Sequence, residues 1–502
     1  MFRKLLVANR GEIAVRVFRT CRELGIETVA VASEADKDAV HTRCADQAVQ
    51  IGGSEPSQSY LDSRKIIEAA QETGADAIHP GYGFLSERSE FSRACRDAGV
   101  TFVGPSPEAM DRLGAKIDAK KLAVENGVPV TPGYFEPGAT ADVLKSAAEQ
   151  IGYPVMLKAS AGGGGRGMRI VRDPAQFEQE FDLASEEALK SFGDGAMMVE
   201  KLIDRPRHIE VQVLADNHGQ VACLFERECS LQRRHQKVIE EAPSPAMTEQ
   251  LWSKMQAASR TLVLAAGYQG AGTVEFMVDS TTEEFYFLEV NARLQVEHPV
   301  TEAITGLDLV EWQLRIACGE PLDIGKSLMT GDRNAIKGHA IEARIVAEDP
   351  SKGFLPSIGK IVGWAGPTGL GVRFDTGFGN GSEVSRYYDS LVGKVIVAAA
   401  DRERAVTKLR SALKDTHILG VKTNISYLLD VTAHQDFESA DFDTGFLGRE
   451  FGDWKPSGEI PKGLFELVSA AQSTSATPGA KEGKIQGAWD LADGFRITRL
   501  KT

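Results

Sequence analysis

The sequence has few cysteines and no long apolar run, and both absences limit what the protein can be. None of its six cysteines stands in a Cys-x-x-Cys spacing, which is typical of reduced thiols in a cytosol. No apolar stretch approaches the roughly 20 residues of a membrane-spanning helix. The strand-like run Leu5–Ala8 directly follows Arg3 and Lys4, so we expect no signal peptide, no membrane association and a cytoplasmic location.

Basic residues are scarce as well. The chain has 57 Lys and Arg against 71 Asp and Glu, a formal net charge of -14, and no basic stripe, which disfavours nucleic acid as a partner. With 42% hydrophobic residues and a mean hydropathy of -0.20, the composition is typical of a soluble globular protein. A length of 502 residues suggests about three domains at roughly 150 residues each.

Strand and helix signals alternate through the first hundred residues. Short apolar runs separated by amphipathic segments predict a parallel, doubly wound α/β sheet, with strands near 5–8, 28–32, 75–78 and 101–103. Ligands of such sheets lie beyond the carboxyl ends of the strands. The loop His79–Glu87 follows one of these strands, and its glycines would let backbone approach a ligand, although a plain Gly/Pro turn explains them equally well.

A glycine-rich segment follows the strand-like run Tyr153–Lys158. Residues 159–168 include four consecutive glycines and formally satisfy the dinucleotide fingerprint, but that motif must open a helix, and Met168–Arg172 alternates like a strand. No Lys-Ser/Thr pair follows the last glycine, which excludes a Walker loop. We therefore predict a flap that closes over phosphates through backbone N–H groups. A flexible hairpin tip without a ligand is the alternative, and Lys158 at the root of the loop favours the anion.

Two further segments suit a nucleotide or another anion. Glu200–Ile203 combines backbone edge groups with a short apolar surface, as an adenine site requires. Arg233, Arg234, His235 and Lys237 concentrate positive charge in an acidic protein. A solvated charge run explains such a cluster equally well by itself, but beside a phosphate flap it indicates charge for an anionic substrate.

The most informative stretch runs from Glu289 to Pro299, because its polar side chains fall on every second position. In an extended chain these side chains share one face: Glu289, Asn291, Arg293, Gln295 and Glu297. Phe285 and Phe287 continue the same every-second-position pattern toward the N-terminus. We therefore expect one face of the strand to be aromatic and buried at first and polar from Glu289 onward. The alternative is a solvated edge strand with chance alternation. The nearby Pro299 disfavours a regular strand as far as Val296.

A second strand-like run, Thr273–Asp279, precedes this one, and the polar residues 280–283 between them predict a hairpin turn. A turn centred on Thr282 places Glu275 directly opposite Glu289, where two like charges are destabilising unless a cation lies between them. Carboxylate and amide oxygens are ligands that Mg²⁺ prefers. The hairpin therefore predicts a magnesium site that serves a nucleotide.

Five motifs in this order resemble the biotin carboxylase component of the acyl-CoA carboxylases, an ATP-grasp family. They are Val7–Glu12, His79–Glu87, Lys158–Met168, Arg233–Lys237 and Glu289–Pro299. The resemblance covers about residues 1–450 and implies an α/β ATP-grasp fold. It divides the chain into an N-terminal doubly wound domain at 1–115, an ATP-grasp domain at 116–335 with a flap or lid near 131–203, a C-terminal β-rich domain at 336–450, and a linker at 451–502 that begins a possible bridging region.

The resemblance also implies roles for individual residues. ATP would be bound by Lys116, Lys158, Gly164, Gly165, Glu200, Lys201, Leu202, Ile203, His208, His235, Glu275 and Glu289, and the metal by Glu275, Glu289 and Asn291. Bicarbonate would contact Lys237, Arg293, Gln295 and the backbone of Val296. Glu297 would be the base that deprotonates bicarbonate, while Arg344 and Tyr82 would face biotin. The catalytic set would thus be Lys237, Arg293, Glu297 and Arg344.

The implied activity is that of an ATP-dependent C–N ligase with Mg²⁺ or Mn²⁺ as its metal. Because the chain has no biotin-accepting Met-Lys-Met motif, we expect a separate carrier protein or domain to supply biotin. A carboxyltransferase subunit would complete a homodimeric or larger complex of the acetyl- or propionyl-CoA type. Another biotin-dependent carboxylase, another ATP-grasp ligase and a non-catalytic nucleotide-binding scaffold are the alternatives.

Overall fold

In the computed structural model, the described residues are 1–456 except 115, 137 and 161–166. Gly164 and Gly165 of the predicted flap, and nearly all of the predicted linker at 451–502, lie outside them. Met1–Trp454 form one compact unit. None of the helices in the described ranges combines the length and the hydrophobicity that a membrane crossing requires.

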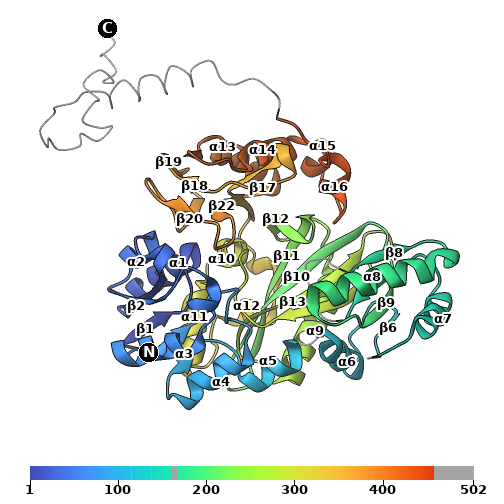
Figure 1. Cartoon of the computed structure of the whole chain (residues 1–502), viewed down its shortest axis with the longest axis horizontal. Coiled ribbons are helices and arrows are strands. Elements are labelled where there is room, and N and C mark those ends of the chain that lie inside the picture. The colour runs from blue at the N-terminus through green and yellow to red at the C-terminus, as the bar shows by residue number, and fades with distance from the viewer. Residues whose placement is uncertain (115, 137, 161–166, 457–502) are drawn as a thin grey trace, which may run out of the picture. The chain divides into compact units, whose positions relative to one another are not determined.

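The N-terminal region is the parallel sheet that the sequence predicts (Figure 1). Its strands follow the order β3-β2-β1-β4-β5, with bounds β1 Lys4–Val7, β2 Glu27–Ser33, β3 Gln47–Gly52, β4 Ala77–His79 and β5 Thr101–Phe102. Helices lie on its two faces because both faces of these apolar strands need cover: α1 Gly11–Glu23, α2 Val40–Cys44, α3 Ser63–Thr73 and α4 Ser89–Asp97. The next helix, α5 Pro107–Gly114, contributes Ala109, Met110 and Leu113 to a different hydrophobic core. The loop His79–Glu87 leaves β4 at the carboxyl edge of the sheet.

A long antiparallel sheet forms the centre of the molecule. Its order is β14-β13-β10-β11-β12-β15-β22-β20, with bounds β10 Pro206–Ala215, β11 Val221–Arg233, β12 Gln236–Ala242, β13 Gly270–Asp279, β14 Phe285–Asn291, β15 His339–Val346, β20 Val372–Thr376 and β22 Leu391–Ala399. Helices α6 Lys116–Glu125, α9 Glu249–Ala266, α10 His298–Thr305, α11 Leu309–Ala317 and α12 Lys326–Thr330 accompany it. The pairing of β12 with β15 carries this sheet across the boundary predicted at residue 336.

The β13–β14 hairpin confirms that Glu275 and Glu289 are direct partners. The prediction that Phe285 and Phe287 share the face of Glu289 is wrong. The register shifts between Glu275 and Phe276, because Leu288 is an extra residue in β14 and forms a β-bulge. Phe285 and Phe287 therefore belong to the hydrophobic core, whereas Leu288 and Glu289 line a cavity on the other face. Without the bulge, strict alternation would have placed Glu289 on the aromatic face.

A smaller sheet forms the predicted lid region. It has the order β6-β9-β7-β8, with bounds β6 Gly133–Tyr134, β7 Val155–Ala159, β8 Arg169–Val171 and β9 Met197–Lys201. Helices α7 Ala141–Ile151 and α8 Phe177–Phe192 pack on it around a separate hydrophobic core (Figure 1). Antiparallel pairing of β7 with β8 confirms the two predicted strands on either side of the glycine-rich segment.

The C-terminal region is rich in short strands, as the sequence predicts. The strands are β16 Glu348–Asp349, β17 Leu355–Pro356, β18 Gly359–Lys360, β19 Gly363–Ala365, β21 Glu383–Val384 and β23 His417–Leu419. Helices α13 Arg402–Lys414, α14 Ile425–Ala433, α15 Gln435–Glu438 and α16 Phe446–Glu450 follow, and they share one core with β15 and β22.

Candidate active site

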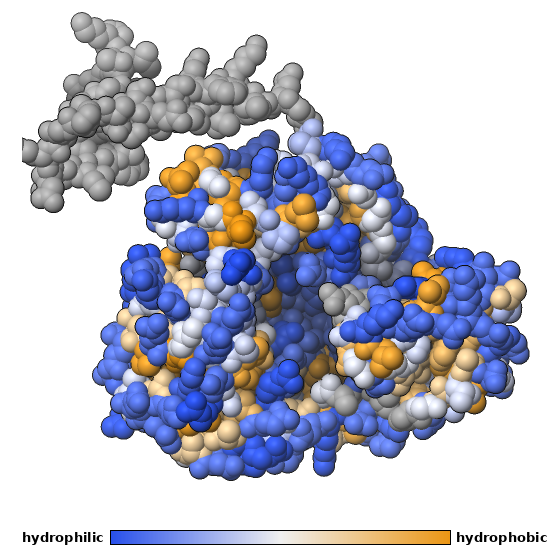
Figure 2. All heavy atoms as spheres, in the orientation of Figure 1, coloured by the Kyte–Doolittle hydropathy of each residue, from blue (hydrophilic) through white to orange (hydrophobic). Residues whose placement is uncertain are grey.

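A cavity of about 1010 Å³ lies among the lid sheet, the central sheet and the C-terminal region. Figure 2 shows it as a hydrophilic hollow near the middle of the molecule. Most of the predicted site residues line it: Tyr82, Lys116, Lys158, Glu200, Lys201, Leu202, Ile203, His208, His235, Lys237, Glu275, Glu289, Asn291, Arg293, Gln295, Val296 and Arg344. Glu297 is fully buried behind this lining.

Glu275 is the centre of a hydrogen-bond network on the cavity wall. Its Oε1 accepts hydrogen bonds from Lys237 Nζ at 2.9 Å, Asn291 Nδ2 at 2.9 Å and Gln295 Nε2 at 3.2 Å, while Oε2 lies 2.8 Å from His208 Nε2. Burial opposes ionisation of this carboxyl, but Lys237 and His208 hold its pKa well below the usual range. Glu275 is therefore a carboxylate before any substrate binds.

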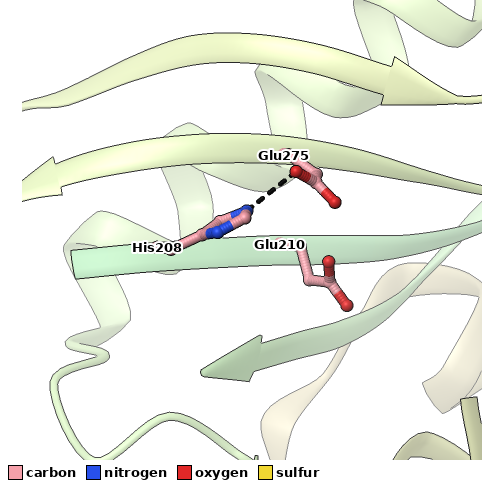
Figure 3. A group of neighbouring side chains, drawn as sticks. All are labelled: His208, Glu210 and Glu275. Carbon is pink, nitrogen blue, oxygen red and sulfur yellow. Dashed lines mark hydrogen bonds and ion pairs between the residues drawn. The ribbon is translucent and has the colours of Figure 1, made fainter. Parts of the chain in front are cut away.

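Lys237 joins three carboxylates. Its ammonium donates to Glu210 Oε2 at 2.6 Å and to Glu297 Oε1 at 2.6 Å, besides the bond to Glu275. His208, Glu210 and Glu275 bring their ligand atoms within 4.8 Å of one another (Figure 3). The ammonium of Lys237 bonds two of these three side chains, Glu210 and Glu275. The lysine therefore supplies the positive charge that a metal ion could otherwise supply to this group.

Glu297 lies between two cations at the start of α10. The strand β14 ends at Asn291, so the chain reaches Glu297 through a turn, and Glu297 is the N-terminal capping residue of the helix. Its Oε2 accepts a hydrogen bond from Arg344 at 2.8 Å, opposite the Lys237 contact. Burial opposes its ionisation, but Lys237, Arg344 and Arg227 hold its pKa well below the usual range. A buried carboxylate held ionised in this way can accept a proton.

Two arginines face the cavity from different elements. Arg344, on β15, is fixed by its Nε bond to Glu240 Oε1 at 2.5 Å. Arg293 follows β14, and its guanidinium donates to Asn291 Oδ1 at 3.1 Å and Gln295 Oε1 at 3.2 Å. These contacts orient two positive charges in a site that already contains Lys237, so the cavity can bind an anion.

The chemistry of the donor set fits a divalent metal. Glu275 and Glu289 face each other across the hairpin, and the Oδ1 atom of Asn291 adds an amide oxygen. Lys116 Nζ lies 3.2 Å from Glu289 Oε2 and supplies positive charge beside this pair. Hard oxygen ligands of this kind suit Mg²⁺, which keeps positions for water and phosphate.

Lysines line the part of the cavity next to the lid. Lys158 on β7 donates to Glu200 Oε2 at 2.5 Å, and Lys120 on α6 contacts the other oxygen of this buried carboxylate. Burial, together with the neighbouring charge of Lys116, lowers the pKa of Lys158 to about 8. Adjacent lysines that repel one another are suited to bind polyphosphate.

Sequence reasoning missed four residues of this network: Lys120, Glu210, Arg227 and Glu240. Glu210 was detectable, because His208, Glu210 and Gln212 alternate along β10. Part of the predicted basic cluster was misread. Arg233 lies 3.7 Å from the ring centre of Phe354 and pairs with Glu348 at 3.5 Å, so it serves packing, whereas Arg234, His235 and Lys237 line the cavity.

A parallel N-terminal sheet, a separate lid sheet, and a cavity with lid lysines and paired carboxylates define a ligase of the ATP-grasp class. Three family descriptions match the chain: "Biotin carboxylase, N-terminal domain" over residues 1–110, "Carbamoyl-phosphate synthase L chain, ATP binding domain" over 115–325, and "Biotin carboxylase C-terminal domain" over 342–449. The chain belongs to the biotin carboxylase family.

Individual relatives support this assignment. Biotin carboxylase 2 of Bacillus subtilis is 51% identical over 89% of this chain and 99% of its own length. The rat mitochondrial methylcrotonoyl-CoA carboxylase subunit alpha is 48% identical over 90% of this chain, but the match spans only 63% of that longer protein.

Solved structures agree with the sequence relatives. The biotin carboxylase–β-γ-ATP complex from Campylobacter jejuni superposes with a TM-score of 0.84 at 45% identity, over 90% of this chain and 99% of that chain. The biotin carboxylase domain of 2-oxoglutarate carboxylase from Hydrogenobacter thermophilus, in complex with MgADP, ADP and bicarbonate, gives 0.84 at 46% identity, over 89% and 98%.

Proposed function

We propose that this chain carboxylates biotin with ATP and bicarbonate, as the first half-reaction of an acyl-CoA carboxylase. The observation that carries the proposal is the arrangement of Lys237, Glu297 and Arg344, in which an ionised buried carboxylate lies between two cations beside the cavity. Relatives described as biotin carboxylase and as methylcrotonoyl-CoA carboxylase support it.

ATP would bind between the lid and the central sheet. Lys116 and Lys158 would contact its phosphates, and Glu200–Ile203 would hold adenine along the edge of β9. Glu275, Glu289 and Asn291 would hold Mg²⁺ or Mn²⁺, which when bound neutralises the transferring phosphoryl oxygens. The structure of a relative in complex with MgADP supports a site for magnesium and a nucleotide.

Bicarbonate would lie beside Arg293, Gln295 and the backbone N–H of Val296. Bicarbonate is a poor nucleophile, and Glu297 would remove its proton while Lys237 and Arg293 hold the developing negative charge. The deprotonated oxygen attacks the γ-phosphorus, the bond to ADP breaks, and carboxyphosphate results. This intermediate is labile in water, so a flap that excludes solvent protects it.

Biotin would enter from the side of Arg344 and Tyr82, both of which line the cavity. Carboxyphosphate releases CO₂ and phosphate. The ureido nitrogen of biotin gives its proton to the released phosphate and bonds to CO₂, while Arg344 stabilises the enolate that forms. A separate biotin carboxyl carrier protein or domain would deliver biotin.

A carboxyltransferase subunit would take the carboxyl group onward within a homodimeric or larger cytoplasmic complex. We propose an acyl-CoA acceptor of the acetyl- or propionyl-CoA type. The methylcrotonoyl-CoA carboxylase relatives support an acyl-CoA in general, and the transferase would select among acyl groups. A pull-down from the native cell, followed by assay of the captured transferase with each acyl-CoA, tests this choice.

A direct test of the half-reaction measures ADP release by the purified chain. We expect cleavage of ATP to require bicarbonate and Mg²⁺ and to be stimulated by free biotin. Omission of bicarbonate, with all other components present, is the control. ATP cleavage that is indifferent to biotin would reject the assignment and favour another ATP-grasp ligase.

A further inference from the structure

Lys394 is a fully buried lysine in the middle of β22. An ammonium group leaves water only where partners replace its hydration, so its contacts are informative. It stands opposite Arg344 in the β15–β22 register, and side chains paired in this way share one face of the sheet. Lys394 therefore lies on the same face of the sheet as Arg344, a predicted catalytic residue, but is buried beneath the cavity lining.

The shortest contact of this ammonium is to backbone. Lys394 Nζ donates to the carbonyl oxygen of Val296 at 2.6 Å. Its nearest carboxylate, Glu12 Oε1 in the first turn of α1, is farther away at 3.4 Å. Neither oxygen of Glu12 has a hydrogen-bond partner among the described residues. The ammonium of Lys394 is therefore hydrogen-bonded to the Val296 carbonyl, and the Glu12 carboxylate lies close enough to offset the positive charge of Lys394.

The Val296 carbonyl belongs to the peptide unit that joins Val296 to Glu297. Regular strand pairing ends at Asn291, so the ladder of β14 does not set the orientation of this peptide. Other contacts fix the neighbouring residues, because the carbonyl of Gln295 accepts a bond from His298 Nδ1 at 2.8 Å. Lys394 bonds the next carbonyl along the chain, that of Val296, which directly precedes the predicted base Glu297.

We propose that Lys394 is a positioning residue for the bicarbonate step. Its ammonium fixes the Val296–Glu297 peptide, so that the Glu297 carboxylate keeps the orientation in which it meets bicarbonate. Glu12 of the N-terminal sheet region supports Lys394, so residues from the N-terminal and C-terminal regions together hold a segment of the ATP-grasp region. This role rests on the proposed function.

A small displacement of a catalytic group lowers the rate steeply, which makes the role measurable. In Lys394→Met, a side chain of similar length lacks the charge and the donor. We expect the apparent KM for bicarbonate to rise at least about tenfold, while the KM for ATP changes less than about twofold. Glu12→Gln keeps the carbonyl contact, so its bicarbonate KM should stay within about threefold of the wild type.

The matched control is Glu241→Gln, a buried carboxylate on β12 that bonds Arg402 and lies outside the proposed catalytic set. It should lower the melting temperature without selective change in the bicarbonate KM. If Lys394→Met does not fold, Lys394→Gln is measured instead. Its amide can still donate to a carbonyl, and we expect a smaller, still selective rise.

Two results would overturn the proposal in different ways. An unchanged bicarbonate KM in a folded Lys394 variant, or equal changes for bicarbonate and ATP, would show that Lys394 has only a structural role. Wild-type protein without bicarbonate-dependent ATP cleavage would overturn the proposed function, and with it any positioning role.

Discussion

Arg344 donates a hydrogen bond to Glu297 across 2.8 Å. The arginine comes from β15 and the glutamate from the start of α10, so two elements far apart in the chain form one contact. In the proposed reaction Glu297 takes a proton from bicarbonate and Arg344 faces biotin. The contact means that Arg344, from the proposed biotin site, helps to keep Glu297 ionised in the proposed bicarbonate site.

Replacement of the proposed base should separate binding from chemistry. In Glu297→Gln the side chain keeps its size and loses its basicity, so we expect bicarbonate-dependent ATP cleavage to fall about 10²- to 10⁴-fold. The Kd for ATP should change less than about threefold. Equilibrium ATP binding and steady-state ADP release measure the two effects. Parallel losses of both would mean that Glu297 is structural.

Lys158 should make ATP binding depend on pH. Burial, with the neighbouring charge of Lys116, lowers its pKa to about 8. Free protein therefore loses this charge as the pH rises through 8, whereas bound phosphates favour the charged form. We expect weaker ATP binding above pH 8 and net proton uptake on binding.

Calorimetry at pH 8.5, in two buffers with different ionisation enthalpies, measures that uptake. Lys158→Met should remove it and weaken binding at neutral pH. Lys145→Met should change neither, because Lys145 lies on α7, pairs with Glu178 and does not line the cavity. Uptake that persists in Lys158→Met would assign the proton to another group.

Arg227 should be important for stability although it lies outside the predicted site. It is fully buried and donates to Gln212 Oε1 at 2.6 Å and Thr301 Oγ1 at 3.0 Å, and it also contacts Glu210. Arg227→Met removes one partner of a buried ion pair, so we expect a loss of about 3 kcal/mol in the free energy of unfolding.

Denaturant unfolding, read by circular dichroism, measures this loss. Arg64→Met, which breaks a pair on the surface with Glu68, should cost less than about 1 kcal/mol. Equal stability of the Arg227 and Arg64 variants would contradict a structural role for the buried pair.

His79 should make the fold sensitive to acid. Burial lowers the pKa of this imidazole to about 4, whereas in the unfolded chain it is about 6.5. Between these values only the unfolded chain takes up the proton, so the stability is complete above about pH 6.5 and falls as the pH drops toward 4. The full effect is about 3 kcal/mol.

Urea unfolding between pH 7 and 5 measures the slope. We expect a shallower loss of stability in His79→Gln than in the wild type, because one titrating group has been removed. The exposed His417 provides the control, and His417→Gln should keep the wild-type slope. Identical slopes for all three proteins would show that His79 is not the responsible group.

Local periodicity was enough to predict much of the fold. Apolar runs separated by amphipathic segments identified the parallel N-terminal sheet, because buried parallel strands are apolar on both faces. The hairpin turn placed Glu275 opposite Glu289, since pairing near a short turn is a local property. Four of the five motifs contribute residues to one cavity, and Val7–Glu12 does not. This gathering followed from resemblance rather than from periodicity.

The alternation of polar and apolar residues in the sequence does not predict the β-bulge at Leu288. A bulge adds one residue without a turn signal, and it moved the aromatic side chains to the core while the carboxylates kept the cavity. The same strand pattern could not place Glu297, because the chain leaves the strand after Asn291. Its position depends on a turn and on the start of α10.

The sequence by itself thus determined the elements, the hairpin partners and the family. Only the tertiary structure decided which charges meet: Lys237 with three carboxylates, Arg344 with Glu240 and Glu297, and Lys394 with the Val296 carbonyl. These contacts join segments that lie far apart in the chain. Periodicity reports the face on which a side chain lies, whereas the partner on that face depends on how the sheet is assembled.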